Sequence, residues 1–311
     1  MKHRRRSYSR KTKMQRTTLI IALFAVLLGL SIGYSTFSTN INLTAKGNIK
    51  DKSRIIQSWD KTSNEDFHTD FYKESIVSVT FLDNNIVPNN AVEKWDISET
   101  KDQGVMAYVT ESQVETGKYD LYIGAKNGVI ANRNSSYLFK GFKGIKSINF
   151  NNNFDTSKTT NMIYMFAYCT NVTNLDLKSF NTNNVYEMGG MFEGCNNLKE
   201  VDISSFNTKK VKTMWYMFAE CHELTQINLS NFNINNLNSM SSMFQGCQNL
   251  KEINLCTFNT SKVEYYKELF SYTTSLEKVY VGNDWTLQDT PESKLFLNSA
   301  ISSVTTGECN N

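Results

Sequence analysis

Histidine and proline are scarce in this sequence, with three and two residues among 311. His3 lies in a basic N-terminal segment, so His68 and His222 are the only histidines in the rest of the sequence. Neither belongs to an HExxH motif. No GxSxG, P-loop or GxGxxG pattern occurs either. The sequence therefore offers no catalytic residue, metal site or cofactor site. We expect that the protein is not an enzyme, with a hydrolase as the remote alternative.

Acidic residues are absent from residues 1–16, which hold eight of the 33 basic residues. The remaining chain carries 25 basic and 30 acidic residues, a formal charge of −5. Phosphate binding needs clustered cations, so this mildly acidic body argues against nucleic acid as a partner. The basic cluster needs another explanation.

Charge of either sign is missing from residues 17–45, and residues 17–34 are nearly all apolar. Eighteen helical residues span about 27 Å, close to the hydrocarbon thickness of a bilayer. Basic residues before such a segment favour a tail inside and a body outside. The pattern predicts an uncleaved signal-anchor, with secretion after cleavage as the alternative. No cysteine precedes Cys169, which excludes a lipid-attachment cysteine after this segment.

The same residue types recur every 26 positions in the second half of the chain. The columns are Cys169, Cys195, Cys221 and Cys247; Phe154, Phe180, Phe206, Phe232 and Phe258; and Met162, Met188, Met214 and Met240. The free energy gained by burying the apolar side chains of a single unit does not offset the conformational entropy lost when that unit becomes ordered. The units are therefore expected to stack and share a core.

Each unit contains two local periodicities. Met214, Met217, Phe218 and Cys221 follow the i, i+3, i+4, i+7 spacing of an amphipathic helix, whereas residues 224–229 end in the alternation of a strand. The sequence therefore predicts an α/β solenoid with one short helix and one short strand per unit.

The unit LKEVDISSFNTKKVKTMWYMFAEC (198–221) resembles the 26-residue repeat of BspA-family leucine-rich-repeat surface proteins of bacteria. The resemblance covers about residues 75–290. It implies a leucine-rich-repeat solenoid exposed at the bacterial cell surface and associated with adhesion, without catalytic residues. Two departures are the missing lipobox and the irregular segment after Trp285.

These observations predict six parts. They are a basic cytoplasmic tail (1–16), a transmembrane signal-anchor (17–34), a polar spacer (35–74), a β-rich capping region (75–145), the leucine-rich-repeat solenoid (146–290) and an irregular C-terminal cap (291–311).

The cysteine column has two interpretations. Stacked neighbours would lie within disulfide range, but each cysteine completes an apolar stripe, which favours buried free thiols. Cys256 lies outside the column at a position that faces solvent in our interpretation, and Cys309 has no assigned role.

Candidate binding residues occupy positions that the core does not dictate. Trp215, Tyr216 and Tyr164 stand between the two methionines of their units, where side chains should point outward, although simple surface variation also explains them. A second column contains Asp176, Asp202, Asn228 and Asn254. This column predicts a solvated polar sheet face rather than a pair of catalytic carboxylates.

The leading functional hypothesis is a binding protein, anchored at the cell surface, that contacts host, matrix or envelope material through its repeats. Its partner would be an unknown protein or glycan outside the cell, besides the membrane through residues 17–34. The alternative is a structural envelope spacer without a specific ligand.

Overall fold

The computed structural model describes residues 52–306 and residue 309, which belong to one compact unit. This part of the chain contains a short 3-10 helix, η1 (Asp66–His68), and one α-helix, α2 (Asp70–Ser75). The strands of the N-terminal part are β1 (Ile76–Leu82), β2 (Glu93–Asp96), β3 (Val105–Glu111), β4 (Tyr119–Ala125), β5 (Val129–Ile130), β6 (Ser147–Asn149) and β7 (Phe154–Asp155). The later strands are β8 (Asn174–Asp176), β9 (Glu200–Asp202), β10 (Glu252–Leu255), β11 (Lys278–Val281) and β12 (Thr305–Thr306).

The N-terminal part is a five-stranded mixed sheet in the order β2-β3-β4-β1-β6. Strand β1 pairs in parallel with β4 and with β6, so Val79 lies between Leu121 and Ile148. Alternate residues of β1 are buried, as expected for a strand with one face on the core. Residues before the sheet also reach the core, because Trp59 and Phe67 are fully buried.

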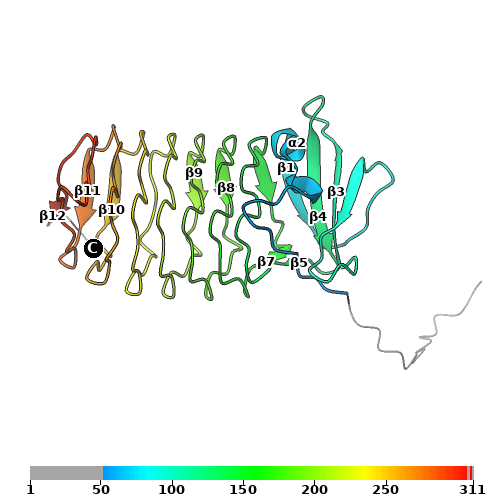
Figure 1. The fold of residues 1–311 in the computed structure, drawn as a ribbon, viewed down its shortest axis with the longest axis horizontal. Helices are drawn as coiled ribbons and strands as arrows, with labels where there is room; N and C mark the ends of the chain where they lie inside the picture. The colour runs from blue at the N-terminus through cyan, green and yellow to red at the C-terminus, as the bar shows by residue number, and fades with distance from the viewer. Residues whose placement is uncertain (1–51, 307–308, 310–311) are drawn as a thin grey trace, which may run out of the picture. The chain divides into compact units, whose positions relative to one another are not determined.

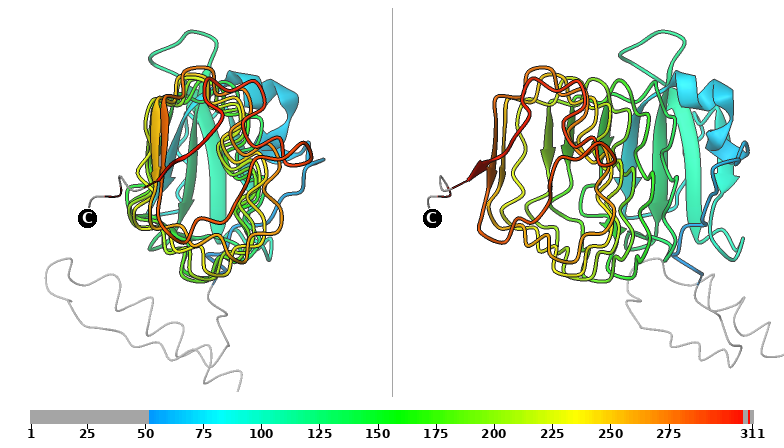
Figure 2. Two further views of the ribbon diagram at one scale, coloured as in Figure 1. Left: turned by 90° about the vertical axis from the view of Figure 1, so that its left-hand side faces the viewer. Right: turned by 60° about the vertical axis from the view of Figure 1, so that its left-hand side comes forward.

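After this sheet the chain winds into a stack of 26-residue repeats, which Figure 1 shows side by side. The repeats superpose closely when viewed along the stack (Figure 2). Parallel bridges join equivalent residues of successive repeats: Asn134 to Asn161, Asn161 to Glu187, Glu187 to Thr213, Thr213 to Ser239 and Ser239 to Tyr265. The backbone N–H and C=O groups of each repeat therefore form hydrogen bonds with the neighbouring repeats.

A ladder of phenylalanine rings runs through the stack. Its members are Phe139, Phe166, Phe192, Phe218, Phe244, Phe270 and Phe296. Successive ring centroids lie 5.3–5.9 Å apart and the planes differ by at most 14°. The methionine and cysteine columns are buried beside it, and one hydrophobic cluster extends from the N-terminal sheet through all repeats.

The predicted α/β leucine-rich-repeat solenoid is wrong, because the described residues are mainly strands and turns, and no helix follows α2. In the Met162 segment, the N–H of Met165 donates to the carbonyl of Met162 (3.2 Å), which closes a tight turn. The N–H of Tyr164 instead donates to Gly189 in the next repeat (3.0 Å). Tyr164 and Tyr168 have left-handed backbone conformations, with φ of 56° and 60°. Consecutive turns thus reproduce the side-chain spacing of a helix without its i to i−4 hydrogen bonds.

The C-terminal segment that the sequence marks as irregular continues the stack. Phe296 packs on Phe270, and β12 pairs in parallel with β11. A disulfide joins Cys256 to Cys309 across a sequence separation of 53 residues.

The predicted signal-anchor, residues 17–34, and the basic tail, residues 1–16, lie outside the described residues. Within residues 52–306, no helix is long and apolar enough to cross a bilayer. The prediction of a single-pass protein of the bacterial cell membrane is corrected accordingly, and no membrane location is assigned to this chain.

Candidate binding surface

The three aromatic residues that the sequence singles out converge on one surface. This surface, called the turn face below, consists of the tight turns at residues 137–141, 161–169, 187–195, 213–221 and their successors. The rings of Tyr164 and Trp215 meet edge to face, with centroids 5.3 Å apart, and Trp215 contacts Tyr216 at 6.1 Å. Tyr216 is 39% exposed, and the other two side chains are half-buried.

Two glycines make this convergence possible. Tyr164 and Trp215 belong to alternate repeats, and Gly189 and Gly190 lie in the repeat between them. A Cβ atom on Gly189 would lie 2.4 Å from the Trp215 ring, and one on Gly190 would lie 2.3 Å from the Tyr164 ring. Both rings therefore rest directly against the backbone of the intervening repeat. Side chains at these positions would push the rings away.

Further residues of the turn face were not predicted from the sequence. Tyr137 contacts Tyr164 with centroids 5.6 Å apart, and Lys140 Nζ lies 4.4 Å from the centroid of Tyr164. The hydroxyl of Tyr168 donates a hydrogen bond to the Glu193 carboxylate. Tyr168 occupies the position that Gly194 holds one repeat later, where its ring covers the glycine. Alignment of the repeats, which places Tyr168 and Gly194 at the same position, would have identified Tyr168 as a residue of the turn face.

The electrostatics of the turn face keep Tyr164 and Tyr168 protonated. Burial, followed by the negative charge of Glu193, raises the pKa of Tyr164 to about 12. Burial and the hydrogen bond to Glu193 also raise the pKa of Tyr168. Burial raises the pKa of Glu193 as well and lowers that of Lys140. The buried Glu193 Oε2 has no hydrogen-bond partner among the described residues. The turn face thus combines aromatic rings with phenol donors and a carboxylate acceptor.

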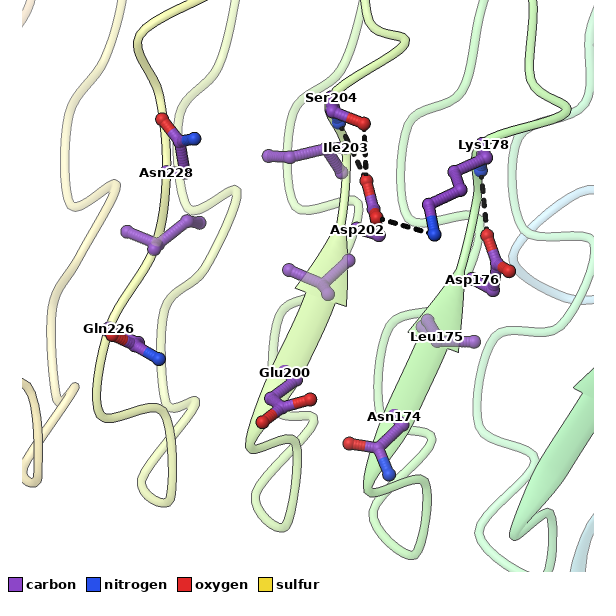
Figure 3. A pocket seen from close by; sticks show the side chains of 12 residues that line it. Asn174, Leu175, Asp176, Lys178, Glu200, Asp202, Ile203, Ser204, Gln226 and Asn228 are labelled. Atoms are coloured by element: carbon purple, nitrogen blue, oxygen red, sulfur yellow. Dashed lines mark hydrogen bonds and ion pairs between the residues drawn. The ribbon is translucent and has the colours of Figure 1, made fainter.

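Three residues of the second predicted column, Asp176, Asp202 and Asn228, line a shallow hollow of about 690 Å³ on the sheet face, formed by β8, β9 and residues 226–228, whereas Asn254 lies outside it. In Figure 3, Asp176, Asp202 and Asn228 lie above Asn174, Glu200 and Gln226 on the three neighbouring repeats that line this hollow. Lys178 Nζ lies 3.2 Å from Asp202 Oδ2, an exposed ion pair. Such pairs contribute about 0–1 kcal/mol to stability.

The side chains of all four residues in this column stabilise the turn that directly follows them in the chain. The side-chain oxygens of Asp176, Asp202, Asn228 and Asn254 each accept a hydrogen bond from the backbone N–H two residues later, at 3.0–3.1 Å. This local turn is a common use of Asp and Asn. The column therefore has a structural role that explains its residue types without a ligand.

The cysteine column consists of buried free thiols, as the preferred interpretation predicts. Each Sγ lies 3.1–3.2 Å from a phenylalanine carbonyl oxygen of the preceding repeat. Burial raises the pKa of Cys195 to about 12. The pairing of Cys256 with Cys309 was not predicted. Across residues 52–306 and residue 309, no group of three His, Cys, Asp or Glu side chains is placed to hold a metal ion.

The fold defines a repeat protein built from stacked 26-residue units. A family described as "Mycoplasma protein of unknown function, DUF285" matches residues 133–252 and 226–305. Together the two matches span residues 133–305, more than half of the 311 residues, and the chain belongs to this family. No curated protein and no solved structure matches the chain.

Proposed function

We propose that this chain is a binding protein that holds its ligand on the turn face and so mediates contact with host, matrix or envelope material. The observation that carries the proposal is the convergence of Tyr164, Trp215 and Tyr216 over the Gly189–Gly190 backbone. Two repeats contribute the rings and a third contributes the space for them. The same repeat positions hold Gly189, Gly190, Ser241 and Ser242 in other repeats, so the repeat itself does not require aromatic side chains there.

The chemistry of the cluster suits recognition. Tyrosine and tryptophan supply large contact areas at a low cost in side-chain entropy and dominate the energetics of many interfaces. The rings of Tyr164 and Trp215 already contact each other and the backbone before a ligand arrives. Preorganisation of this kind reduces the entropy that binding must offset.

The proposal is tested with the full-length chain immobilised and exposed to a panel of purified matrix proteins and polysaccharides. A matched variant carries Tyr164→Ser, Trp215→Ser and Tyr216→Ser, and its fold is verified by circular dichroism. We expect at least one panel member to bind the natural chain and to bind the variant at least tenfold more weakly. Absence of any ligand, or equal binding by the variant, contradicts the proposal and favours a structural spacer.

A further inference from the structure

The turn face repeats along the stack, so it presents equivalent groups to a ligand at a regular interval. The interval is the spacing between repeats, about 4.8 Å for backbones joined by parallel bridges. The phenylalanine ring centroids, which lie 5.3–5.9 Å apart, follow the same repeat. Tyr164 and Tyr216 occupy one repeat position two repeats apart, and Tyr168 and Tyr272 occupy another position four repeats apart. The latter two are 38% and 42% exposed. A ligand lying along the stack therefore meets exposed aromatic rings over several repeats.

A linear polysaccharide has a matching periodicity. One sugar ring in an extended chain advances by a length close to one repeat of this stack. The C–H face of a sugar ring packs on aromatic rings, and its hydroxyl groups pair with carboxylates and phenols. Trp215, Tyr164 and Tyr216 supply the rings, while the partly exposed Glu220 carboxylate and the Tyr168 hydroxyl oxygen supply polar partners.

The charges of the turn face select against a polyanionic chain. Burial raises the pKa of Glu193 and the negative charge of Glu220 acts in the same direction, while His222 is hydrogen-bonded to Glu220 at 2.8 Å. The ammonium of Lys140 already faces the rings of Tyr137, Tyr164 and Tyr168. Two carboxylates next to the aromatic cluster would repel the acidic groups of a charged polysaccharide.

We infer that the ligand of the turn face is an uncharged linear polysaccharide, laid along the stack with Trp215 and Tyr164 at the centre of its contact. This inference rests on the proposed binding function and names its ligand class. It places successive sugar rings over successive repeats, so affinity must grow with chain length until the turn face is covered.

Isothermal titration of the full-length chain tests this inference with cellohexaose, β-1,4-mannohexaose and maltohexaose, each compared with its disaccharide. We expect at least one hexasaccharide to bind at least tenfold more tightly than its disaccharide. The variant Trp215→Ala should weaken that binding at least tenfold. Phe71→Ala, which removes an aromatic residue that is 57% exposed outside the turn face, should leave it unchanged.

Failure of the polysaccharide inference can be distinguished from failure of the proposed binding function. If no hexasaccharide binds but a matrix protein binds through Trp215, the polysaccharide inference is overturned and the proposed function stands. If a hyaluronan hexasaccharide binds as tightly as the best uncharged one, the selection by charge is wrong. Should Trp215→Ala unfold, Gly189→Ala replaces it, because that change displaces the ring without removing it. Binding that survives this displacement also overturns the inference.

Discussion

Glycine at positions 189 and 190 determines how closely two aromatic rings of the turn face approach the backbone. Gly190 has a left-handed conformation with φ of 61°, which favours glycine by itself. Gly189 has no such requirement, and the three atoms nearest to the place that its Cβ would take all belong to the Trp215 ring. Gly189 is therefore the residue at which ring placement can be tested with the least backbone strain.

We expect Gly189→Ala to move the Trp215 ring away from the intervening repeat while the fold is retained. The emission of Trp215 should change because its surroundings change, and ligand affinity should fall at least tenfold. Ser241→Ala is the matched control, since Ser241 occupies the same repeat position and already has a Cβ atom. An unchanged emission spectrum and affinity in Gly189→Ala would show that ring placement does not depend on the glycine.

His68 provides a pH-dependent contribution to stability at the N-terminal end. Its ring stacks on Trp59 with centroids 4.4 Å apart, and its Nε2 lies 2.8 Å from the Leu138 carbonyl oxygen. Burial lowers its pKa to about 3, and the nearby positive charge of Lys73 acts in the same direction. The folded state therefore keeps this imidazole neutral at pH values where the unfolded chain binds a proton, below about 6.5.

The contribution of His68 to the free energy of unfolding should be fully present above about pH 6.5. It should decrease by about 1.4 kcal/mol per pH unit as the pH falls toward 3. Urea unfolding at pH 7 and pH 5 should therefore show a loss of about 2 kcal/mol from this residue. In His68→Phe this component of the pH dependence should disappear. An identical pH dependence in the natural chain and the variant would rule out His68 as its source.

At the scale of the element, the repeats are joined by hydrogen bonds from buried threonines as well as by backbone bridges. The hydroxyl of Thr208 accepts from the N–H of Asn233 (2.7 Å) and donates to the carbonyl of Asn233 (2.9 Å). Thr156 and Thr182 make the same pair of bonds to Asn181 and Asn207. Each hydroxyl thus satisfies two backbone groups of the next repeat.

Thr208→Val keeps the shape of the side chain and removes both bonds. We expect the free energy of unfolding to fall by about 1–3 kcal/mol, because two partly buried backbone groups of Asn233 lose their partner. Thr225→Val is the control, since Thr225 is exposed. Chemical denaturation measures both variants. A loss in Thr208→Val no greater than in Thr225→Val would mean that these bonds contribute nothing.

The repeat period and the buried columns were readable from the sequence, because burial recurs at the same position in every unit. The helix in each unit was predicted wrongly, since side-chain spacing does not reveal which carbonyl each N–H will contact. Left-handed backbone conformations such as those of Tyr164 and Tyr168 are unusual for tyrosine, so the residue type does not predict them. The outward position of Trp215 could be predicted, but its contact with Tyr164 depends on the stacking of alternate repeats.

At the scale of the whole molecule, the six cysteines fall into two chemical classes. Four are buried thiols inside the stack, and the other two form the disulfide between Cys256, which follows β10, and Cys309 in the C-terminal segment. Burial raises the pKa of every column thiol and so suppresses the reactive thiolate.

Reduction of the native chain followed by alkylation with iodoacetamide should modify Cys256 and Cys309 alone, as mass spectrometry of the peptides would show. The column cysteines should react only after denaturation. Cys309→Ser should lower the free energy of unfolding by about 2–4 kcal/mol, because the unfolded chain loses a cross-link. Alkylation of Cys195 or Cys221 in the folded protein would contradict the buried column.

Hydroxyl-radical footprinting of the full-length chain, with and without its bound ligand, distinguishes the turn face from the sheet-face hollow in one experiment. If the aromatic cluster is the binding surface, Tyr164, Trp215 and Tyr216 become protected while Val201 and Ile227 of the hollow keep their reactivity. Protection of Val201 and Ile227 with unchanged labelling of the three aromatic residues would contradict this account of the molecule.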